Sequence, residues 1–272
     1  MKKFFQVFYV ILILLFIYAP IFTLVLYSFV DAPIVSIEEA FNIGFSINLY
    51  KKLFADEALM TIVYDTLLLA FIVAILATIL GTLGAIGIFY SKGKFGKGVS
   101  AASRIPVINA EIVTAVALVL LFAFIFSESR SYFALVVGHL VITTPFVVLS
   151  VIPKLKQMDS SLYEAALDLG ATPTQALFKV ILPEILPGIF SGFMLAITLS
   201  LDDYIITATL SPLDFDTIST AVYKAIALTT EKSSEQVPIY RALTTIIFLI
   251  TVMAVVIMNL RANKNDKGKR KV

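Results

Sequence analysis

The feature that most constrains this chain is a series of long runs without a charged side chain. The apolar core of a bilayer is about 30 Å thick, so a helix of about 20 apolar residues crosses it. Six windows reach or approach that length, and the third is interrupted only by Glu111: residues 4–30, 66–91, 105–127, 131–153, 185–201 and 242–260. Since 59% of the residues are hydrophobic and 15% are charged, we predict an all-α integral membrane protein with six transmembrane helices.

The fifth window is too short unless its helix continues through the next residues. We expect it to run on through Asp202 and Asp203 to Leu210. The first run is longer than the apolar part of a signal peptide and has no small-residue cleavage site, so we predict that it stays in the protein as a span. Without cysteine, the chain forms no disulfide and no thiolate metal site.

Basic residues predict the orientation, because short cytoplasmic loops accumulate Lys and Arg. The loop after the second span carries Lys92, Lys94, Lys97 and Arg104 and no acid, and the tail at 261–272 is also basic. The loop after the first span is rich in acids. We therefore expect a chain that crosses the membrane several times and has both termini in the cytoplasm.

One polar insert, residues 161–183, separates the fourth and fifth spans and falls on the cytoplasmic side. Ser161 and Glu164 have the spacing of a capping box, Gly170 is a helix stop, and Thr172–Gln175 repeats the start signal. Pro183 is expected to end the second helix. The insert therefore predicts a helix–turn–helix outside the bilayer.

Three interpretations of this insert compete. It could be an amphipathic hairpin packed on its own spans, or a docking element for a soluble partner. A DNA-binding motif needs basic residues facing phosphate, whereas this insert has Lys179 against Glu164 and Asp168. We therefore expect no nucleic-acid partner.

The insert also resembles the EAA loop of ABC-importer permeases, whose pattern is E-A-A-x3-G-x9-I-x-L-P. The matching residues, with Val180 in place of the usual Ile, are Glu164, Ala165, Ala166, Gly170, Ile181, Leu182 and Pro183. In that family the loop forms coupling helices that sit on the ATPase subunit, so the resemblance implies that these residues couple the chain to a separate ATPase. It implies a permease domain over residues 61–260 with a coupling loop at 159–184. Residues 1–60 would be an N-terminal helix with an extracytoplasmic loop, and 261–272 a cytoplasmic tail.

The chain has no nucleotide-binding loop of its own. In "GKFGKGVS" the glycines Gly93 and Gly98 have the Walker A separation, but Val99 stands where the phosphate-binding lysine is needed. We therefore predict a non-catalytic subunit that binds no cofactor or metal, with ATP and Mg²⁺ used by the partner ATPase.

Acids inside membrane spans are costly and are functional candidates. We expect Glu111 about two turns into the third span, and Asp202 and Asp203 on the outer half of the fifth. Because neighbouring helical residues point about 100° apart, one aspartate could contact substrate while the other bonds a neighbouring helix. The alternative for each acid is a structural hydrogen bond. Tyr204 could offer a cation its ring face.

Two further features are expected to be structural. His139 is a single histidine in the fourth span and is expected to be a hydrogen-bonded interface residue. Ala77, Gly81 and Ala85, joined by Gly84, have the small-xxx-small spacing of closely packed membrane helices.

Intramembrane acids without matching Lys or Arg favour a cationic substrate. Three stretches, "YAPIFTLVLYSF", "PVINAEIVTAVALVLLF" and "LSLDDYIIT", resemble the second permease of spermidine/putrescine ABC importers, the PotC type. The resemblance implies a polyamine importer in which this chain pairs with a related permease as a heterodimer. It also implies two ATPase copies and an extracytoplasmic solute-binding protein.

Other functions remain open at this point. The same machine could carry ferric iron, thiamine or an organic anion. A secondary transporter could use Glu111, Asp202 and Asp203 as proton or sodium sites, but such proteins often have inverted repeats, and no convincing repeat is visible here. A purely structural membrane protein would leave the intramembrane acids unexplained.

Overall fold

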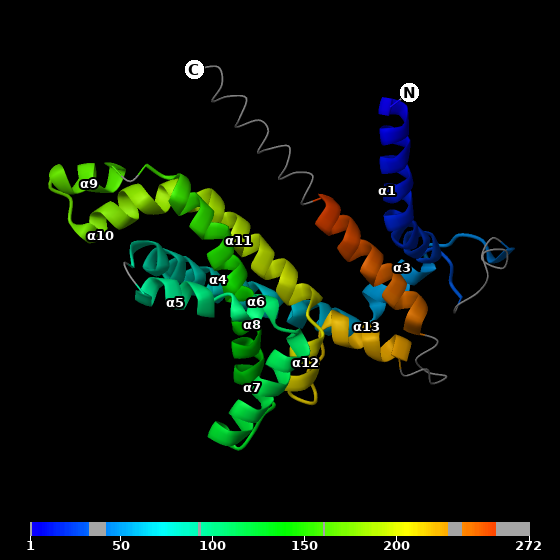
Figure 1. Cartoon of the computed structure of the whole chain (residues 1–272). Coiled ribbons are helices and arrows are strands. Elements are labelled where there is room, and N and C mark those ends of the chain that lie inside the picture. The colour runs from blue at the N-terminus through cyan, green and yellow to red at the C-terminus, as the bar shows by residue number, and fades with distance from the viewer. Residues whose placement is uncertain (1, 33–41, 92–93, 160, 228–235, 254–272) are drawn as a thin grey trace. The chain divides into compact units, whose positions relative to one another are not determined.

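The computed structural model describes residues 2–32, 42–91, 94–159, 161–227 and 236–253, and helices form almost all regular structure in these ranges, with no strand (Figure 1). The predicted all-α membrane fold is confirmed, while the tail at 261–272 lies outside the described residues. The helices are α1 (Lys2–Tyr27), α3 (Asn48–Ala55), α4 (Glu57–Tyr90), α5 (Lys94–Ala102), α6 (Ile105–Ile108), α7 (Glu111–Phe126), α8 (Tyr132–Gln157), α9 (Ser161–Asp168), α10 (Pro173–Ala176), the π-helix Leu177–Ile181, α11 (Leu182–Asp202), α12 (Ile205–Leu210) and α13 (Ile218–Ala227).

Five helices among the described residues are long and apolar enough to cross a membrane: Phe5–Tyr27, Glu57–Tyr90, Tyr132–Gln157, Pro173–Asp202 and Gln236–Met253. A sixth span exists if the helical pair Gly98–Ile108 and Glu111–Phe126 counts as one, but that pair is bent by 108°. The straight third helix predicted for 105–127 is therefore wrong, because the chain turns sharply between α6 and α7.

The chain divides into two compact units, one formed by Ile62–Ala221 and the other by Met1–Thr61 with Val222–Val272. In the Ile62–Ala221 unit, α8 packs along α11 and both contact α4, through a core of small and branched side chains. Lipid is as apolar as these side chains, so close packing and dispersion hold membrane helices together rather than the hydrophobic effect.

Glycine sets how closely these helices approach. A Cβ on Gly81 of α4 would lie 2.6 Å from Val147 Cβ, and one on Gly192 of α11 would lie 2.9 Å from Val147 Cγ1. Ala77 and Ala85 on α4 are fully buried. The predicted small-residue stripe is therefore confirmed as a packing surface, on which α8 lies.

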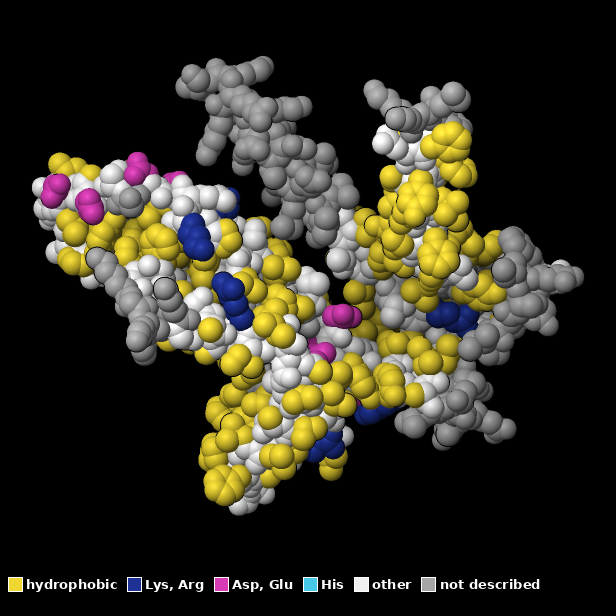
Figure 2. Space-filling model, viewed as in Figure 1, with side chains coloured by type: hydrophobic (Ala, Val, Ile, Leu, Met, Phe, Trp, Pro, Cys, Tyr) yellow, Lys and Arg dark blue, Asp and Glu magenta, His cyan; other side chains and the backbone are white. Residues whose placement is uncertain are grey.

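A second cluster joins α7, α8 and the short helix α12. Ala115 and Phe122 of α7 face Ala134 of α8 and Ile206 of α12. The other sides of α7 are apolar and open: Leu120 is 65% exposed and Phe124 88% exposed. Figure 2 shows hydrophobic side chains covering this helix, as expected for a surface that meets lipid or another membrane helix.

The other unit has its own contacts around the end of α1. Ser28 Oγ lies 2.7 Å from Tyr50 Oη of α3, and Lys52 Nζ lies 2.8 Å from Asp31 Oδ2. Arg241 donates to the carbonyl of Ala32 and stacks over the Tyr27 ring, 5.8 Å from its centre. These polar contacts tie the end of α1 to α3 and to the 236–253 helix.

Candidate functional site

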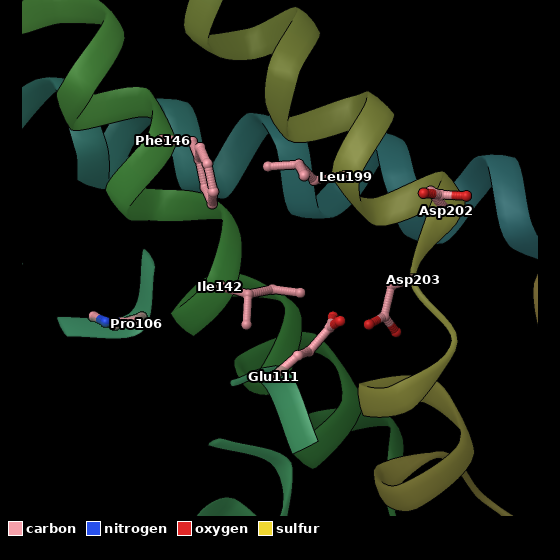
Figure 3. A pocket seen from close by; sticks show the side chains of 7 residues that line it. All are labelled: Pro106, Glu111, Ile142, Phe146, Leu199, Asp202 and Asp203. Atoms are coloured by element: carbon pink, nitrogen blue, oxygen red, sulfur yellow. The ribbon is translucent and has the colours of Figure 1, made fainter. Parts of the chain in front are cut away.

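The candidate site is a cavity of about 210 Å³ in the Ile62–Ala221 unit, where two membrane helices are interrupted (Figure 3). Its lining combines three carboxylates with apolar side chains and contains no Lys or Arg. The lining residues are Pro106, Glu111, Ile142, Phe146, Leu199, Asp202 and Asp203. The three acids predicted for the substrate path therefore come together in one place.

The first interruption brings Glu111 to the cavity. Asn109 and Ala110 adopt extended backbone conformations, with ψ of 146° and 132°, so α6 ends at Ile108 and α7 begins at Glu111. The predicted position of Glu111 two turns inside a straight helix is wrong. Glu111 is instead the first residue of α7, where a carboxylate is favourable beside the unpaired N–H groups of a helix start.

The second interruption brings the two aspartates to the cavity. Helix α11 ends at Asp202, Asp203 is extended with φ −64° and ψ 126°, and α12 begins at Ile205. The predicted continuous helix to Leu210 is therefore wrong. The 100° spacing of helical neighbours does not apply here, because Asp203 is not helical, and both aspartates line the cavity.

The two aspartates differ in their surroundings. The Asp203 side chain is completely buried, while Asp202 and Glu111 are exposed. Asp203 Oδ1 accepts from the N–H of Ile206 at 3.3 Å, and Oδ2 accepts from the N–H and the hydroxyl of Thr207, both at 2.8 Å. In Figure 3 the Glu111 carboxyl group points toward Asp203. Like charges that line one small cavity repel one another, so the site gains from a bound positive charge.

His139 lies behind the cavity and is fully buried. Its Nδ1 is 2.9 Å from Ser200 Oγ, and its Nε2 is 3.1 Å from Thr207 Oγ1 and 3.4 Å from Asp203 Oδ2. The prediction of a hydrogen-bonded interface residue is confirmed.

Ile142, Phe146 and Leu199 were not predicted as cavity residues, and Ser200 and Thr207 were not predicted as partners of His139. The hydroxyl of Thr207, four residues after Asp203, was the signal that could have suggested a local partner for that acid. Tyr204, which was predicted for the substrate path, begins the turn into α12 and does not line the cavity.

The predicted coupling residues lie around an elbow that precedes the start of α11, where α9 and α10 run close together (Figure 1). Gly170 has φ of +86°, a left-handed conformation that favours glycine, as predicted. Thr172 and Gln175 form the predicted capping box of α10. Glu164, Ala165 and Gly170 are exposed, with Ala166 partly buried.

Two details at this elbow differ from the prediction. Ser161 is the first residue of α9 rather than its cap, and its N–H donates to Asp159 Oδ1 at 2.9 Å. This bond lowers the pKa of the Asp159 carboxyl below its usual value, because it favours the charged form.

Pro183 does not end the second helix. The π-helix Leu177–Ile181 joins α10 to α11, so one continuous span runs from Pro173 to Asp202. Pro183 falls in the first turn of α11, where its missing N–H is tolerated because the wider π turn has already shifted the hydrogen-bonding register. Leu182 is partly buried and Pro183 is exposed.

Comparison with known proteins agrees with this architecture. The sequence model of the family "Binding-protein-dependent transport system inner membrane component" matches residues 40–265. The chain is 30% identical to the spermidine/putrescine transport system permease protein PotC of Haemophilus influenzae, over 90% of this chain and 96% of that protein. It is 33% identical to the putrescine transport system permease protein PotI of Escherichia coli, over 78% of this chain and 76% of that protein.

Solved structures give the same fold. A chain from a bacterial ABC transporter involved in the import of the acidic polysaccharide alginate superposes with a TM-score of 0.68 at 18% identity, covering 93% of this chain and 94% of that one. A chain of the MetNI methionine ABC transporter, in an inward-facing conformation, gives 0.58 at 19% identity, over 76% and 98%. The resemblance to ABC-importer permeases is thus confirmed, and this multi-pass membrane chain belongs to the family of binding-protein-dependent transport system inner membrane components.

Proposed function

We propose that this chain is the membrane-spanning permease subunit of an ATP-driven polyamine importer, and that the cavity at the two helix breaks contacts the polyamine on its way through the membrane. The chain itself carries out no catalysis. It forms part of the path and alternates access between the two sides of the membrane.

The composition of the cavity carries this proposal. A polyamine consists of ammonium groups joined by short methylene chains. Glu111, Asp202 and Asp203 supply negative charge without a lining Lys or Arg, and Ile142 and Phe146 offer apolar surface to the methylenes. The Phe146 ring can also face an ammonium group. The sequence relatives support the same cargo, since their names assign them to spermidine and putrescine transport.

The elbow formed by α9 and α10 supports the second half of the proposal, which is docking of a separate ATPase that uses ATP and Mg²⁺. Apolar side chains are open here, with Leu169 at the turn 89% exposed and Phe178 on the following π-helix 61% exposed. Beyond Gly170 the chain is one continuous helix to Asp202. A movement of the elbow can therefore be transmitted to the acidic cavity by one helix, Pro173–Asp202, which is about 45 Å long at about 1.5 Å per residue.

The remaining partners follow from the family and the relatives. We propose a second, related permease as heterodimer partner, for which α7 offers exposed apolar surface. An extracytoplasmic solute-binding protein would deliver the cargo. The location would be a bacterial inner membrane, with both termini cytoplasmic.

Uptake of radiolabelled putrescine and spermidine by the assembled transporter in liposomes tests the cargo. We expect Asp202→Asn and Glu111→Gln each to raise the KM about tenfold, the effect of losing one charged hydrogen bond of roughly 1.5 kcal/mol. Asp214→Asn is the matched control, because Asp214 is exposed and lies outside the cavity. Equal KM values in all three variants would contradict a role of the cavity in cargo binding.

A glycine pair tests the docking of the ATPase. Gly170 and Gly44 both have positive φ, +86° and +82°, and a Cβ on either would meet nothing within 4 Å. A valine costs about 1–3 kcal/mol of backbone strain at each position. We expect Gly170→Val to weaken co-purification of the ATPase and abolish uptake, while Gly44→Val retains both. Normal coupling in Gly170→Val would exclude the elbow as the docking element.

One observation favours a second candidate function. Broken helices beside intramembrane acids also occur in ion-coupled secondary transporters. Dissipating the proton and sodium gradients while internal ATP is maintained separates the two functions. An ATP-driven importer continues to transport, and a secondary transporter stops.

A further inference from the structure

The buried histidine behind the cavity has no part in the proposed function so far. His139 lies on α8, with both ring nitrogens within hydrogen-bonding distance of hydroxyl groups from other helices. Nδ1 is 2.9 Å from Ser200 Oγ on α11, and Nε2 is 3.1 Å from Thr207 Oγ1 on α12. The imidazole therefore bridges the two sides of the second helix break.

The direction of these bonds follows from counting hydrogens. Thr207 Oγ1 lies 2.8 Å from Asp203 Oδ2, and a carboxylate can only accept, so the single hydroxyl hydrogen of Thr207 goes to Asp203. Thr207 Oγ1 must then accept from His139, which means that Nε2 carries a hydrogen. A directed chain of hydrogen bonds thus runs from His139 through Thr207 to the Asp203 carboxylate.

The Asp203 carboxylate accepts its hydrogen bonds from groups of the protein itself. Besides the Thr207 hydroxyl, its carboxylate accepts the N–H groups of Ile206 and Thr207, and its side chain is completely buried. Its backbone carbonyl accepts from Ser219 Oγ at 2.6 Å. Asp203 therefore anchors the first turn of α12, whereas the neighbouring Asp202 is exposed in the cavity wall.

The other end of α12 is also held. The Arg130 guanidinium donates to the carbonyl of Ala208, and the N–H of Ser131 donates to the carbonyl of Leu210 at 3.1 Å. A helix of six residues is too short to be stable on its own. Its place is therefore set by anchors at both ends, and the anchor nearest the cavity is Asp203.

We propose that His139 and Thr207 are positioning residues of the cation site. They hold Asp203 as the anchor of α12 and thereby fix the break that presents Asp202 to the cavity beside Glu111. Neither residue lines the cavity. The proposal rests on the proposed function in one respect, namely that Asp202 contacts the cargo.

Transport kinetics provide the first test. Thr207→Val removes the hydroxyl at nearly constant shape and is expected to raise the KM for putrescine about fivefold, with Vmax and the amount of assembled transporter unchanged. Thr207→Ser restores the hydroxyl and should lie within twofold of wild type. Thr209→Val is the matched control, because the Thr209 hydroxyl bonds only to Ile205 and Ile206 carbonyls of its own helix.

The same substitution in a second background tests whether Thr207 acts through Asp202. In Asp202→Asn, we expect Thr207→Val to add less than twofold to the KM. The proposal is overturned if Thr207→Val has the same effect in both backgrounds, or if it lowers only Vmax or the yield. His139→Gln, whose amide N–H can replace Nε2–H, should transport better than His139→Leu.

A chemical measurement that needs no cargo keeps this proposal separate from the proposed function. The chain has no cysteine, so Asp202→Cys gives one reactive thiol, whose rate of modification by a cationic methanethiosulfonate reports its position. Adding Thr207→Val is expected to change that rate severalfold, while a control thiol at Leu213, which is 84% exposed, reacts as before.

An unchanged rate at position 202 overturns the positioning role. A changed rate supports it, and it continues to do so even if Asp202→Asn has a wild-type KM. In that last case the cargo contact in the proposed function is wrong, while the positioning role stands.

Discussion

The long helix that begins at Pro173 has one irregularity near its start and a break at its end, and the two contrast. Near its start it passes Pro183 and Pro187 without ending, and a π-helix absorbs the irregularity. At its other end it stops at Asp203, in a stretch, "LSLDDYIIT", with no proline or glycine.

The contrast separates local from tertiary causes of a helix break. A proline removes one N–H and crowds one preceding carbonyl, and a wider turn can accommodate both. The break at Asp203 opens several backbone N–H groups inside the membrane, which is possible only where other protein groups satisfy them. The Asp203 carboxylate accepts from two of these N–H groups, those of Ile206 and Thr207, and the Ser219 hydroxyl donates to the carbonyl of Asp203.

Removing the anchor should have the largest effect. Asp203→Ala leaves the N–H groups of Ile206 and Thr207 and the Thr207 hydroxyl without their acceptor, and each buried orphan costs about 1–3 kcal/mol. We expect a loss on the order of 3 kcal/mol or more in the free energy of unfolding, measured by SDS titration in mixed micelles. Asp202→Ala, at an exposed neighbour, should stay within about 1 kcal/mol. Equal losses would show that the break does not depend on Asp203.

Crowding the contact between α8 and α12 should have the next largest effect. A Cβ on Gly138 of α8 would lie 2.6 Å from both Ile206 Cγ2 and Leu210 Cδ1. We expect Gly138→Ala to cost about 1–3 kcal/mol in the same titration, since overpacking displaces the short helix. Gly84→Ala is the control, with its nearest neighbour, Val148 Cγ2, at 3.7 Å. A neutral Gly138→Ala would mean that α12 can shift freely.

At the proline end, substitution should change little. Pro183→Ala restores an N–H beside the π-helix, and we expect the stability to change by less than about 1 kcal/mol. Spin labels at Phe178 and Leu195, both exposed, should stay about 25 Å apart, as in one continuous helix rising about 1.5 Å per residue. A clearly shorter distance in the unsubstituted chain would indicate a kink at Pro183.

The smallest effect concerns the start of α9, across the elbow from this helix. The bond from Ser161 lowers the pKa of Asp159 below its ordinary value of 3.8. The charged carboxylate therefore stabilises the start of α9 above that value, and this stabilisation disappears as the pH falls through the lowered pKa. Hydrogen exchange of the Ser161 amide should therefore accelerate below about pH 4, beyond its intrinsic pH dependence. In Asp159→Asn this additional change should vanish, and its persistence there would assign it to another group.

Much of the fold could be predicted from the sequence, because its signals are local. Long uncharged runs predicted membrane helices, and Gly170 and the capping box at Thr172 predicted the turn of the elbow. The pattern around Glu164 predicted the family, which the comparison with known proteins confirmed. The first two signals depend on solubility in lipid or on neighbours within about one helical turn, and the family pattern lies within one continuous segment, Glu164 to Pro183.

The site required the tertiary structure. The sequence identified Glu111, Asp202 and Asp203 as unusual, since an acid in an apolar run is visible by itself. It could not show that both helices break beside these acids. At the break after Asp202, groups distant in sequence take part: Ser219 donates to the carbonyl of Asp203, and His139 bonds to Thr207. Helix propensity is decided over a few residues, whereas the satisfaction of a buried carbonyl or hydroxyl also depends on the groups that the fold brings within about 3 Å. Only the tertiary structure places the three acids around one cavity.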